Sequence, residues 1–155
     1  MRRAKLAVLG LVTLSLCSCS LFGGGKKSGE EGAGEGNIPL ADAGGPLQDV
    51  HFDYDSSDIT AAGQSTLRSN GQWLLDNPGH DVVVEGHCDE RGTAEYNMAL
   101  GERRARSAAD YLKTAGVPSK SISTVSYGEE LPLDPGHTED AWAKNRRDHF
   151  AISKN

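Results

Sequence analysis

The sequence predicts an α/β fold in which a small sheet is covered by helices. Short segments rich in β-branched and aromatic residues alternate with longer segments whose apolar residues recur at steps of three and four. Threonines that can cap helices, and Asn-Pro-Gly or Gly-Val-Pro sequences that end them, separate these segments. The resulting order of elements, β-α-β-α-β-α-β, suits helices packed on a sheet.

The first strand and helix are expected soon after residue 47. Val50 and Phe52 alternate as in a short strand, and residues 53–58 form a polar turn. Thr60 is placed to cap a helix, and residues 77–79, Asn-Pro-Gly, end it. The apolar stripe of this helix is predicted to contain Leu67, Gly71, Leu74 and Leu75.

The middle of the chain predicts a buried strand followed by the longest helix. Val82, Val83 and Val84 indicate the strand, and Thr93 is expected to cap the helix. Gly116, followed by Val-Pro, ends it. The predicted buried face of this helix consists of Ala94, Met98, Gly101, Ala105, Ala108 and Leu112.

The last part of the domain predicts two more strands and a short helix. Ile122 and Val125 indicate a third strand. Residues 138–140, Thr-Glu-Asp, resemble the acidic first turn of a helix around Trp142. Phe150 and Ile152 alternate as in a final strand.

Residues 1–18 have the pattern of a lipoprotein signal peptide. Basic residues precede the apolar run 6–16, which at 11 residues is too short to cross a bilayer. The run leads into Leu16-Cys17-Ser18-Cys19, which resembles a lipobox, and Cys19 is the expected lipidation site because Cys17 follows bulky Leu16. Alternatively, both cysteines are incidental small residues in an ordinary secretory signal.

Residues 19–46 are predicted to be a lipidated, flexible tether, and residues 47–155 the folded domain. Glycine recurs with Ser, Lys and Glu up to residue 36, and such a segment cannot bury enough apolar surface to fold. Extended, it would reach roughly 90 Å at about 3.3–3.6 Å per residue. Such a tether would let an anchored domain search for a target away from the membrane.

Charge and cysteine usage exclude two classes of protein. The 155 residues have a net charge of −6, and loss of residues 1–18 would remove only basic charges, so nucleic acid is not an expected partner. If Cys19 is acylated and Cys17 is cleaved off, Cys88 has no partner within the chain, which excludes a disulfide scaffold.

The stretch 86–105, G-H-C-D-E-R-G-T-A-E-Y-N-M-A-L-G-E-R-R-A, contains the most specific motif. It resembles the peptidoglycan-binding signature of OmpA-like domains. Matching positions also occur at residues 52–55 and in the N-R-R sequence at 145–147, so the resemblance covers about residues 47–155. The signature positions are Asp89, Gly92, Asn97, Leu100, Arg103 and Arg104.

The resemblance implies a fold and a ligand. The fold would be an OmpA-like β-α-β-α-β-(α)-β sandwich with a mixed four-stranded sheet. The ligand would be meso-diaminopimelate of the peptidoglycan stem peptide, with Asp89 binding its ammonium and Arg104 its carboxylate. The pocket would be completed by Phe52, Asp53, Leu100 and Asn97, with Asn145 and Arg146 at its rim.

The residue types suit such a ligand on physical grounds. Asn97, Leu100 and Arg104 share one helix face, and Asp89 lies in the loop that enters this helix. A carboxylate pairs with an ammonium, and a planar guanidinium can grip a carboxylate through two parallel hydrogen bonds. The free end of diaminopimelate carries both groups on one carbon, so two opposite poles would recognise it.

Each of these residues also has a purely structural interpretation. Asp89 could cap the following helix. Arg104 could be a solvated helix residue paired with Glu102 or Asp110, and residues 145–147 could be an ordinary basic helix end. Glu102 and Arg103 are expected to be exposed.

Other chemistries have less support in the sequence. Residues 87–90 alternate in direction and contain no metal-ligand spacing, so no metal is expected. His87 is interpreted as a packed or hydrogen-bonded strand-end residue. Adjacent His87 and Cys88 are poorly placed to act as base and nucleophile. A glycosidase pair drawn from the carboxylates Asp53, Asp55, Glu85 and Asp89 could indicate a cell-wall hydrolase, but no further catalytic motif accompanies them.

The prediction is therefore a noncatalytic protein with no cofactor beyond the lipid on Cys19. By resemblance, the chain would anchor the outer membrane to peptidoglycan, with its domain in the periplasm. It would partner the TolB propeller and the inner-membrane Tol complex during cell division. A hydrolase and a purely protein-binding envelope module remain the alternatives.

Overall fold

The structure is a computed structural model that describes residues 45–154. The predicted signal peptide, the lipidation site at Cys19 and nearly all of the predicted tether lie outside these residues. Within residues 45–154, no helix is both long enough and apolar enough to cross a membrane.

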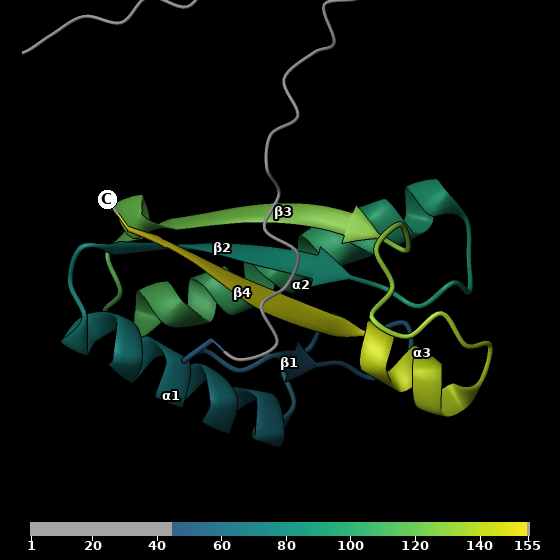
Figure 1. Ribbon diagram of the computed structural model, residues 1–155, viewed down its shortest axis with the longest axis horizontal. Helices are drawn as coiled ribbons and strands as arrows, with labels where there is room; N and C mark the ends of the chain where they lie inside the picture. The colour runs from purple at the N-terminus through teal and green to yellow at the C-terminus, as the bar shows by residue number, and fades with distance from the viewer. Residues whose placement is uncertain (1–44, 155) are drawn as a thin grey trace, which may run out of the picture. The chain divides into compact units, whose positions relative to one another are not determined.

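The described residues form the predicted alternation of strands and helices (Figure 1). A short 3-10 helix, η1, is the only element among them that the sequence did not predict. The elements are β1 (Val50–His51), α1 (Ala61–Asp76), β2 (His80–His87), α2 (Ala94–Thr114), η1 (Ser119–Ser121), β3 (Ile122–Gly128), α3 (Glu139–Asn145) and β4 (Arg147–Lys154).

The four strands make one mixed sheet, as the family resemblance predicted. Their order is β1-β4-β2-β3, with β2 and β3 parallel and β4 antiparallel to both β1 and β2. Helix α2 runs along β2 and β3, and α1 packs beside α2 (Figure 1). Helix α3 lies at the end of the domain where β2 ends and β4 begins.

The core lies between the helices and the sheet. Val82, Val84 and Phe150 contribute from the strands, and Leu67 and Leu112 from the helices, all at most 4% exposed. The hydrophobic effect of burying such side chains, about 25 cal/mol per Å² of apolar surface, is the main force holding the helices on the sheet.

Local capping explains where the helices begin. The side chains of Thr60, Thr93 and Thr138 each accept a hydrogen bond from the backbone N–H three residues later. These are the three predicted helix starts. Helix α1 ends at Asp76, just before the Asn-Pro-Gly sequence predicted to stop it.

Two predicted core faces need correction. Leu75 is 41% exposed because Leu74 takes the inward position of α1, and adjacent helix residues point in different directions. Ala94 is exposed because it lies in the first turn of α2, beyond the edge of the sheet, and Met98 is half-buried.

Helix α2 touches β2 with almost no side chain between them. A Cβ atom on Gly86 would lie only 2.0 Å from the carbonyl oxygen of Gly101, so both positions require glycine. This contact places the first turns of α2 directly beside the end of β2 and the loop that follows it.

Candidate ligand-binding site

A cavity of about 100 Å³ lies where β2 ends and α2 begins. It contains four of the predicted site residues and several residues that the sequence did not single out. Its lining consists of Tyr54, Asp55, Cys88, Asp89, Arg91, Gly92, Tyr96, Asn97, Leu100 and Arg104.

Asn97 holds the loop between β2 and α2 in place. This side chain is 1% exposed, and its amide nitrogen donates to the carbonyl oxygens of Asp89 at 3.2 Å and Arg91 at 3.3 Å. It also donates to the carboxylate of Glu129, in the loop after β3. Gly92 supports the loop with a backbone φ of 130°, a conformation that side chains rarely permit. Asn97 therefore acts through the backbone that carries Asp89.

Asp89 is a buried, fully hydrogen-bonded carboxylate. It is 3% exposed and accepts from the backbone N–H of Arg91 at 3.0 Å and from its Nε and Nη2 at 3.1 and 2.7 Å. Nη1 of Arg146 donates to it at 3.2 Å. Burial alone would raise the pKa of Asp89, but the hydrogen bonds from these arginines outweigh burial and lower it. Asp89 is therefore ionised at neutral pH, and its interpretation as the helix cap is wrong, since Thr93 caps α2.

Arg91 is the main site residue that the sequence analysis missed. Besides binding Asp89, its guanidinium lies 4.1 Å from the ring centroid of Tyr54 and 4.3 Å from that of Trp142. Its Nη1 is 3.4 Å from the Glu139 carboxylate. The only sequence signal was its position two residues after Asp89, because its aromatic neighbours come from distant segments.

Arg104 is fully buried at the back of the cavity. Its guanidinium donates to the carbonyl oxygens of Ser56, His87 and Asp53 at 2.8, 2.9 and 3.1 Å. These bonds join the turn after β1 to the end of β2. The interpretation of Arg104 as a solvated helix residue is wrong, since Glu102 pairs with Arg106 and Asp110 with Lys113.

The remaining predicted residues surround the cavity without lining it. The Phe52 ring is buried, with its centroid 5.0 Å from the Arg104 guanidinium. Asp53 contributes its carbonyl oxygen, while its side chain is exposed. Arg146 is 8% exposed and bridges Asp89 to Glu139.

Asn145 belongs to a neighbouring cavity of about 210 Å³. Its amide is held by the backbone N–H and carbonyl of Asp134, at 2.9 and 2.8 Å. Because residues 145–147 are all buried, their interpretation as an ordinary basic helix end is wrong.

Comparison with known proteins gives the family. The model of the OmpA family matches residues 51–146. The chain belongs to the OmpA family. The peptidoglycan-associated lipoprotein of Pseudomonas aeruginosa is 42% identical over 159 residues, covering 92% of this chain and 93% of the relative. That of Brucella melitensis is 38% identical over 154 residues, covering 94% and 89%.

Solved structures confirm the OmpA-like fold. The crystal structure of the peptidoglycan-associated lipoprotein from Burkholderia pseudomallei matches with a TM-score of 0.66 and 38% identity, over 68% of this chain and 89% of that one. The C-terminal domain of Helicobacter pylori MotB also gives a TM-score of 0.66, over 70% of this chain and 86% of that one. At 21% identity, this second match concerns the fold alone.

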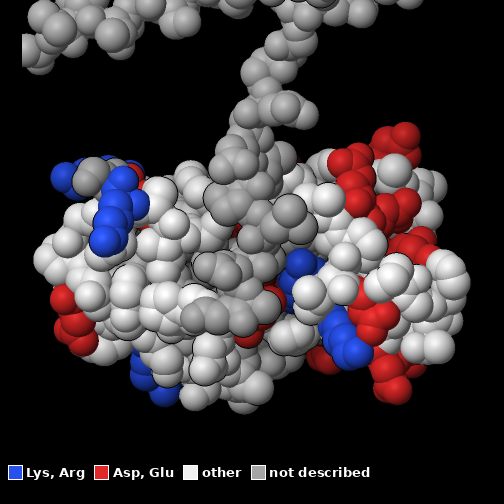
Figure 2. Space-filling model, in the orientation of Figure 1, with Lys and Arg blue, Asp and Glu red and all other residues white. Residues whose placement is uncertain are grey.

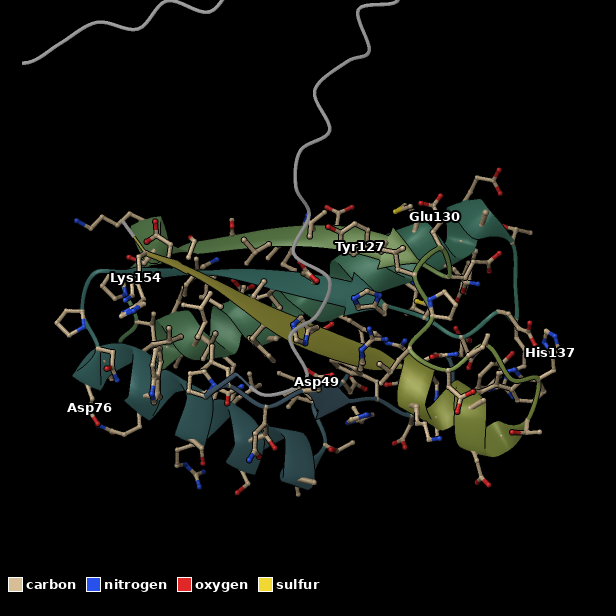
Figure 3. The ribbon with its side chains drawn as sticks, viewed as in Figure 1. Asp49, Asp76, Tyr127, Glu130, His137 and Lys154 are labelled. Carbon is tan, nitrogen blue, oxygen red and sulfur yellow. The ribbon has the colours of Figure 1, made fainter. Side chains whose placement is uncertain are left out.

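In this OmpA-family domain, the cavity lies at the acidic end of the molecule. Acidic side chains gather at the end that holds α3 and the loop after β3 (Figure 2). Glu130 and His137 lie at this end, whereas Asp76 and Lys154 lie at the opposite one (Figure 3). Such a field favours the approach of cationic groups.

The neighbouring His87 and Cys88 do not form a reactive pair. His87 is 3% exposed and stacks on Tyr127 with ring centroids 5.4 Å apart, which confirms its interpretation as a packed strand-end residue. Burial lowers the pKa of His87 to about 3 and raises that of the Cys88 thiol to about 11. Within residues 45–154, no group of three His, Cys, Asp or Glu side chains could hold a metal ion.

Proposed function

We propose that this chain is an outer-membrane lipoprotein whose OmpA-like domain binds peptidoglycan noncovalently, through the diaminopimelate of the stem peptide. The relatives that match nearly its whole length are named peptidoglycan-associated lipoproteins. Its first residues have the pattern of a lipoprotein signal ending at Cys19.

The observation that carries the proposal is the ionised, buried carboxylate of Asp89 at the wall of a small cavity. The cavity also contains the guanidinium groups of Arg91 and Arg104. Together with the carboxylate of Asp55, which also lines the cavity, these groups place two anions and two cations around one small space. Opposite charges at such close range complement the ammonium and carboxylate that diaminopimelate carries on a single carbon. Partial burial strengthens such pairs relative to the same pairs in water.

The pKa of Asp89 does not suit the acid of a glycoside hydrolase. A glycoside hydrolase needs a carboxylic acid whose pKa is raised, so that it can protonate the leaving group near neutral pH. The pKa of Asp89 is lowered instead, because Arg91 and Arg146 hydrogen-bond to its carboxylate. An ion-pairing role needs no proton transfer and agrees with the names of the relatives.

The lipid on Cys19 would hold one end of the chain in the outer membrane while the domain holds the wall. Several acyl chains anchor a protein stably where a single one binds only marginally. The resemblance adds the periplasmic TolB protein and the inner-membrane Tol complex as partners. The exposed face of α2 near Glu102 is a candidate surface for them.

Binding to purified peptidoglycan sacculi tests the proposal. The full chain in detergent would be pulled down by sacculi as wild type, Asp89→Ala and Arg104→Ala. Asp110→Ala is the control, since it removes an exposed aspartate from α2, the helix that also contains Arg104. We expect wild type and Asp110→Ala to bind, free meso-diaminopimelate to compete, and the two site variants to lose at least about tenfold in affinity, equivalent to about 1.4 kcal/mol.

Folding must be checked alongside, because Arg104→Ala removes three hydrogen bonds to carbonyl oxygens. Circular dichroism and thermal unfolding would do so. Equal binding by all variants, or no binding by wild type, would contradict the proposal and favour a purely protein-binding module. Soluble muropeptides released during the incubation would favour a hydrolase.

A further inference from the structure

We propose that Arg91 determines which ligands the cavity accepts, by exchanging its bond with Asp89 for a bond with the ligand's carboxylate. This inference rests on the proposed function and specifies the chemistry of the same site. In it, Arg91 is both the group that a ligand ammonium must displace and the group that then receives the ligand's carboxylate.

Arg91 occupies the place on Asp89 that a ligand ammonium needs. Its Nε and Nη2 approach the two carboxylate oxygens in a side-by-side arrangement, and its backbone N–H adds a third bond. Arg146 supplies the fourth, so Asp89 is 3% exposed. An ammonium therefore reaches Asp89 only after the Arg91 guanidinium has moved away.

Of the two arginines on Asp89, Arg91 is the one that can move. Its side chain is 29% exposed, whereas that of Arg146 is 10% exposed and also donates to the carbonyl oxygen of Phe52 at 3.2 Å. The neighbours that would keep Arg91 near the cavity are Tyr54, 59% exposed, the Glu139 side chain, 63% exposed, and the half-buried ring of Trp142. Stacking on an aromatic face tolerates rotation of the guanidinium in its plane.

Arg104 is less suited to be the sole carboxylate partner. It is completely buried, and three of its five N–H groups already bind carbonyl oxygens of the surrounding backbone. Turning these groups toward a ligand would leave carbonyl oxygens in a buried or partly buried place without their hydrogen-bond donor, which is unfavourable. The displaced Arg91 guanidinium can donate two parallel hydrogen bonds to a ligand carboxylate without leaving such oxygens unpaired.

The charge balance of the site then explains a preference for zwitterions. Asp89, Glu139, Arg91 and Arg146 form a connected network of two negative and two positive groups. A ligand with an ammonium alone adds an unbalanced cation to this partly buried network. A ligand with both an ammonium and a carboxylate replaces the Asp89–Arg91 pair by two pairs, one between its ammonium and Asp89 and one between its carboxylate and Arg91. The net charge of the network then stays zero.

Calorimetric titration with two matched small molecules tests the inference. The probes are meso-diaminopimelate and 1,5-diaminopentane, which has the same amines and lacks both carboxylates. The full chain in detergent would be titrated as wild type, Arg91→Ala and Arg91→Gln. Arg106→Ala serves as control, because it removes an exposed arginine that does not touch Asp89.

We expect wild type and Arg106→Ala to prefer diaminopimelate by about tenfold or more, the factor equivalent to about 1.4 kcal/mol. In both Arg91 variants, diaminopentane should bind more tightly than to wild type, since the competitor for Asp89 is gone, and the preference should fall to about threefold or less. Loss of a merely structural arginine would weaken both ligands instead of strengthening one.

An unchanged preference in folded Arg91 variants would overturn the inference and leave the proposed function intact. If wild type binds neither probe and also fails to bind sacculi, the proposed function itself is wrong. If wild type binds sacculi and neither probe, the wall is recognised through other groups and the role of Arg91 is overturned. Arg91→Gln removes the charge and the guanidinium but keeps a polar side chain with an NH2 donor, so it remains informative if Arg91→Ala does not fold.

Discussion

The contact between α2 and β2 and the rim of the Asp89 cavity are built in opposite ways. At the contact, Gly86 and Gly101 bring two backbones together so closely that a single added carbon would overlap an atom of the other element. At the rim, long polar side chains meet through ionic and aromatic contacts, and Arg91 remains 29% exposed. The first region permits one arrangement, whereas the second permits partners to be exchanged.

The difference suggests separate roles for the residues of segment 86–104: some fix the position of the cavity, and others can change partners. The glycine contact and the Arg104 bonds to three carbonyl oxygens position the floor of the cavity. Asn97 positions the backbone of the loop on that floor. Only the Asp89–Arg91 pair then needs to change when a ligand enters.

Breaking the glycine contact should have the largest effect on stability. Gly86→Ala places a Cβ against the Gly101 carbonyl oxygen. Overpacking a core costs about 1–3 kcal/mol, and overlap with a backbone atom is a severe case. The free energy of unfolding should therefore fall by about 3 kcal/mol or more. Chemical denaturation would measure this. Gly71→Ala, in helix α1, is the control and should be neutral or stabilising, because its Cβ would make an ordinary contact with Leu112 of α2. Equal stability of both variants would refute the tight contact.

Removing the anchor of the loop should affect binding and stability together. Asn97→Ala leaves buried carbonyl oxygens unsatisfied, so the free energy of unfolding should fall by about 2 kcal/mol. Sacculus binding should fall as well, because the backbone that carries Asp89 loses its support. Asn70→Ala is the matched control, since Asn70 is also buried and binds only the backbone of Gln48. If Asn70→Ala reduces binding equally, the loss reflects stability alone.

The smallest expected effect concerns the ion pair between His149, on β4, and Asp49, which directly precedes β1. Nδ1 of His149 lies 2.7 Å from Asp49, which is labelled over the sheet in Figure 3. The hydrogen bond to Asp49 raises the pKa of His149 above its usual value. Burial of the ring opposes this rise, and the charges of Glu85 and Arg147 make smaller upward and downward contributions. The pair therefore stabilises the fold fully below about pH 6.5, and this contribution is lost as the pH rises through the raised pKa.

Thermal unfolding from pH 5.5 to 9 would measure that contribution. Wild type should lose up to about 1 kcal/mol of stability more than Asp49→Asn over this range, because a partly exposed pair contributes little. Parallel pH profiles for the two proteins would show that the pair has no such role. This pair connects residues in or beside β4, and neither partner lines the cavity of Asp89 or that of Asn145.

Much of the fold could be predicted from the sequence because its signals are local. The three threonine caps and the Asn-Pro-Gly stop depend on neighbouring residues only. The orientation of Leu75 and Ala94 could not be predicted in the same way, because it depends on which side of each helix meets the sheet and where the sheet ends.

The candidate site could be predicted in part. The signature located Asp89, Asn97, Leu100 and Arg104, which the structure brings to one cavity. The role of Arg91 depends on Tyr54 and Trp142, which lie far from it in sequence and meet it only through the fold. Likewise, the spacing of Arg104 placed it beside Asp89 and could not show that backbone carbonyl oxygens occupy three of its N–H groups.

A crystal structure of the chain with meso-diaminopimelate bound would test the account most directly. We expect a ligand ammonium within hydrogen-bonding distance of the Asp89 carboxylate, with Arg91 turned away from Asp89 and bonded to the ligand's carboxylate. The glycine contact and the Arg104 bonds should be unchanged. A ligand seated elsewhere, or one bound while Arg91 still holds Asp89, would contradict the exchange.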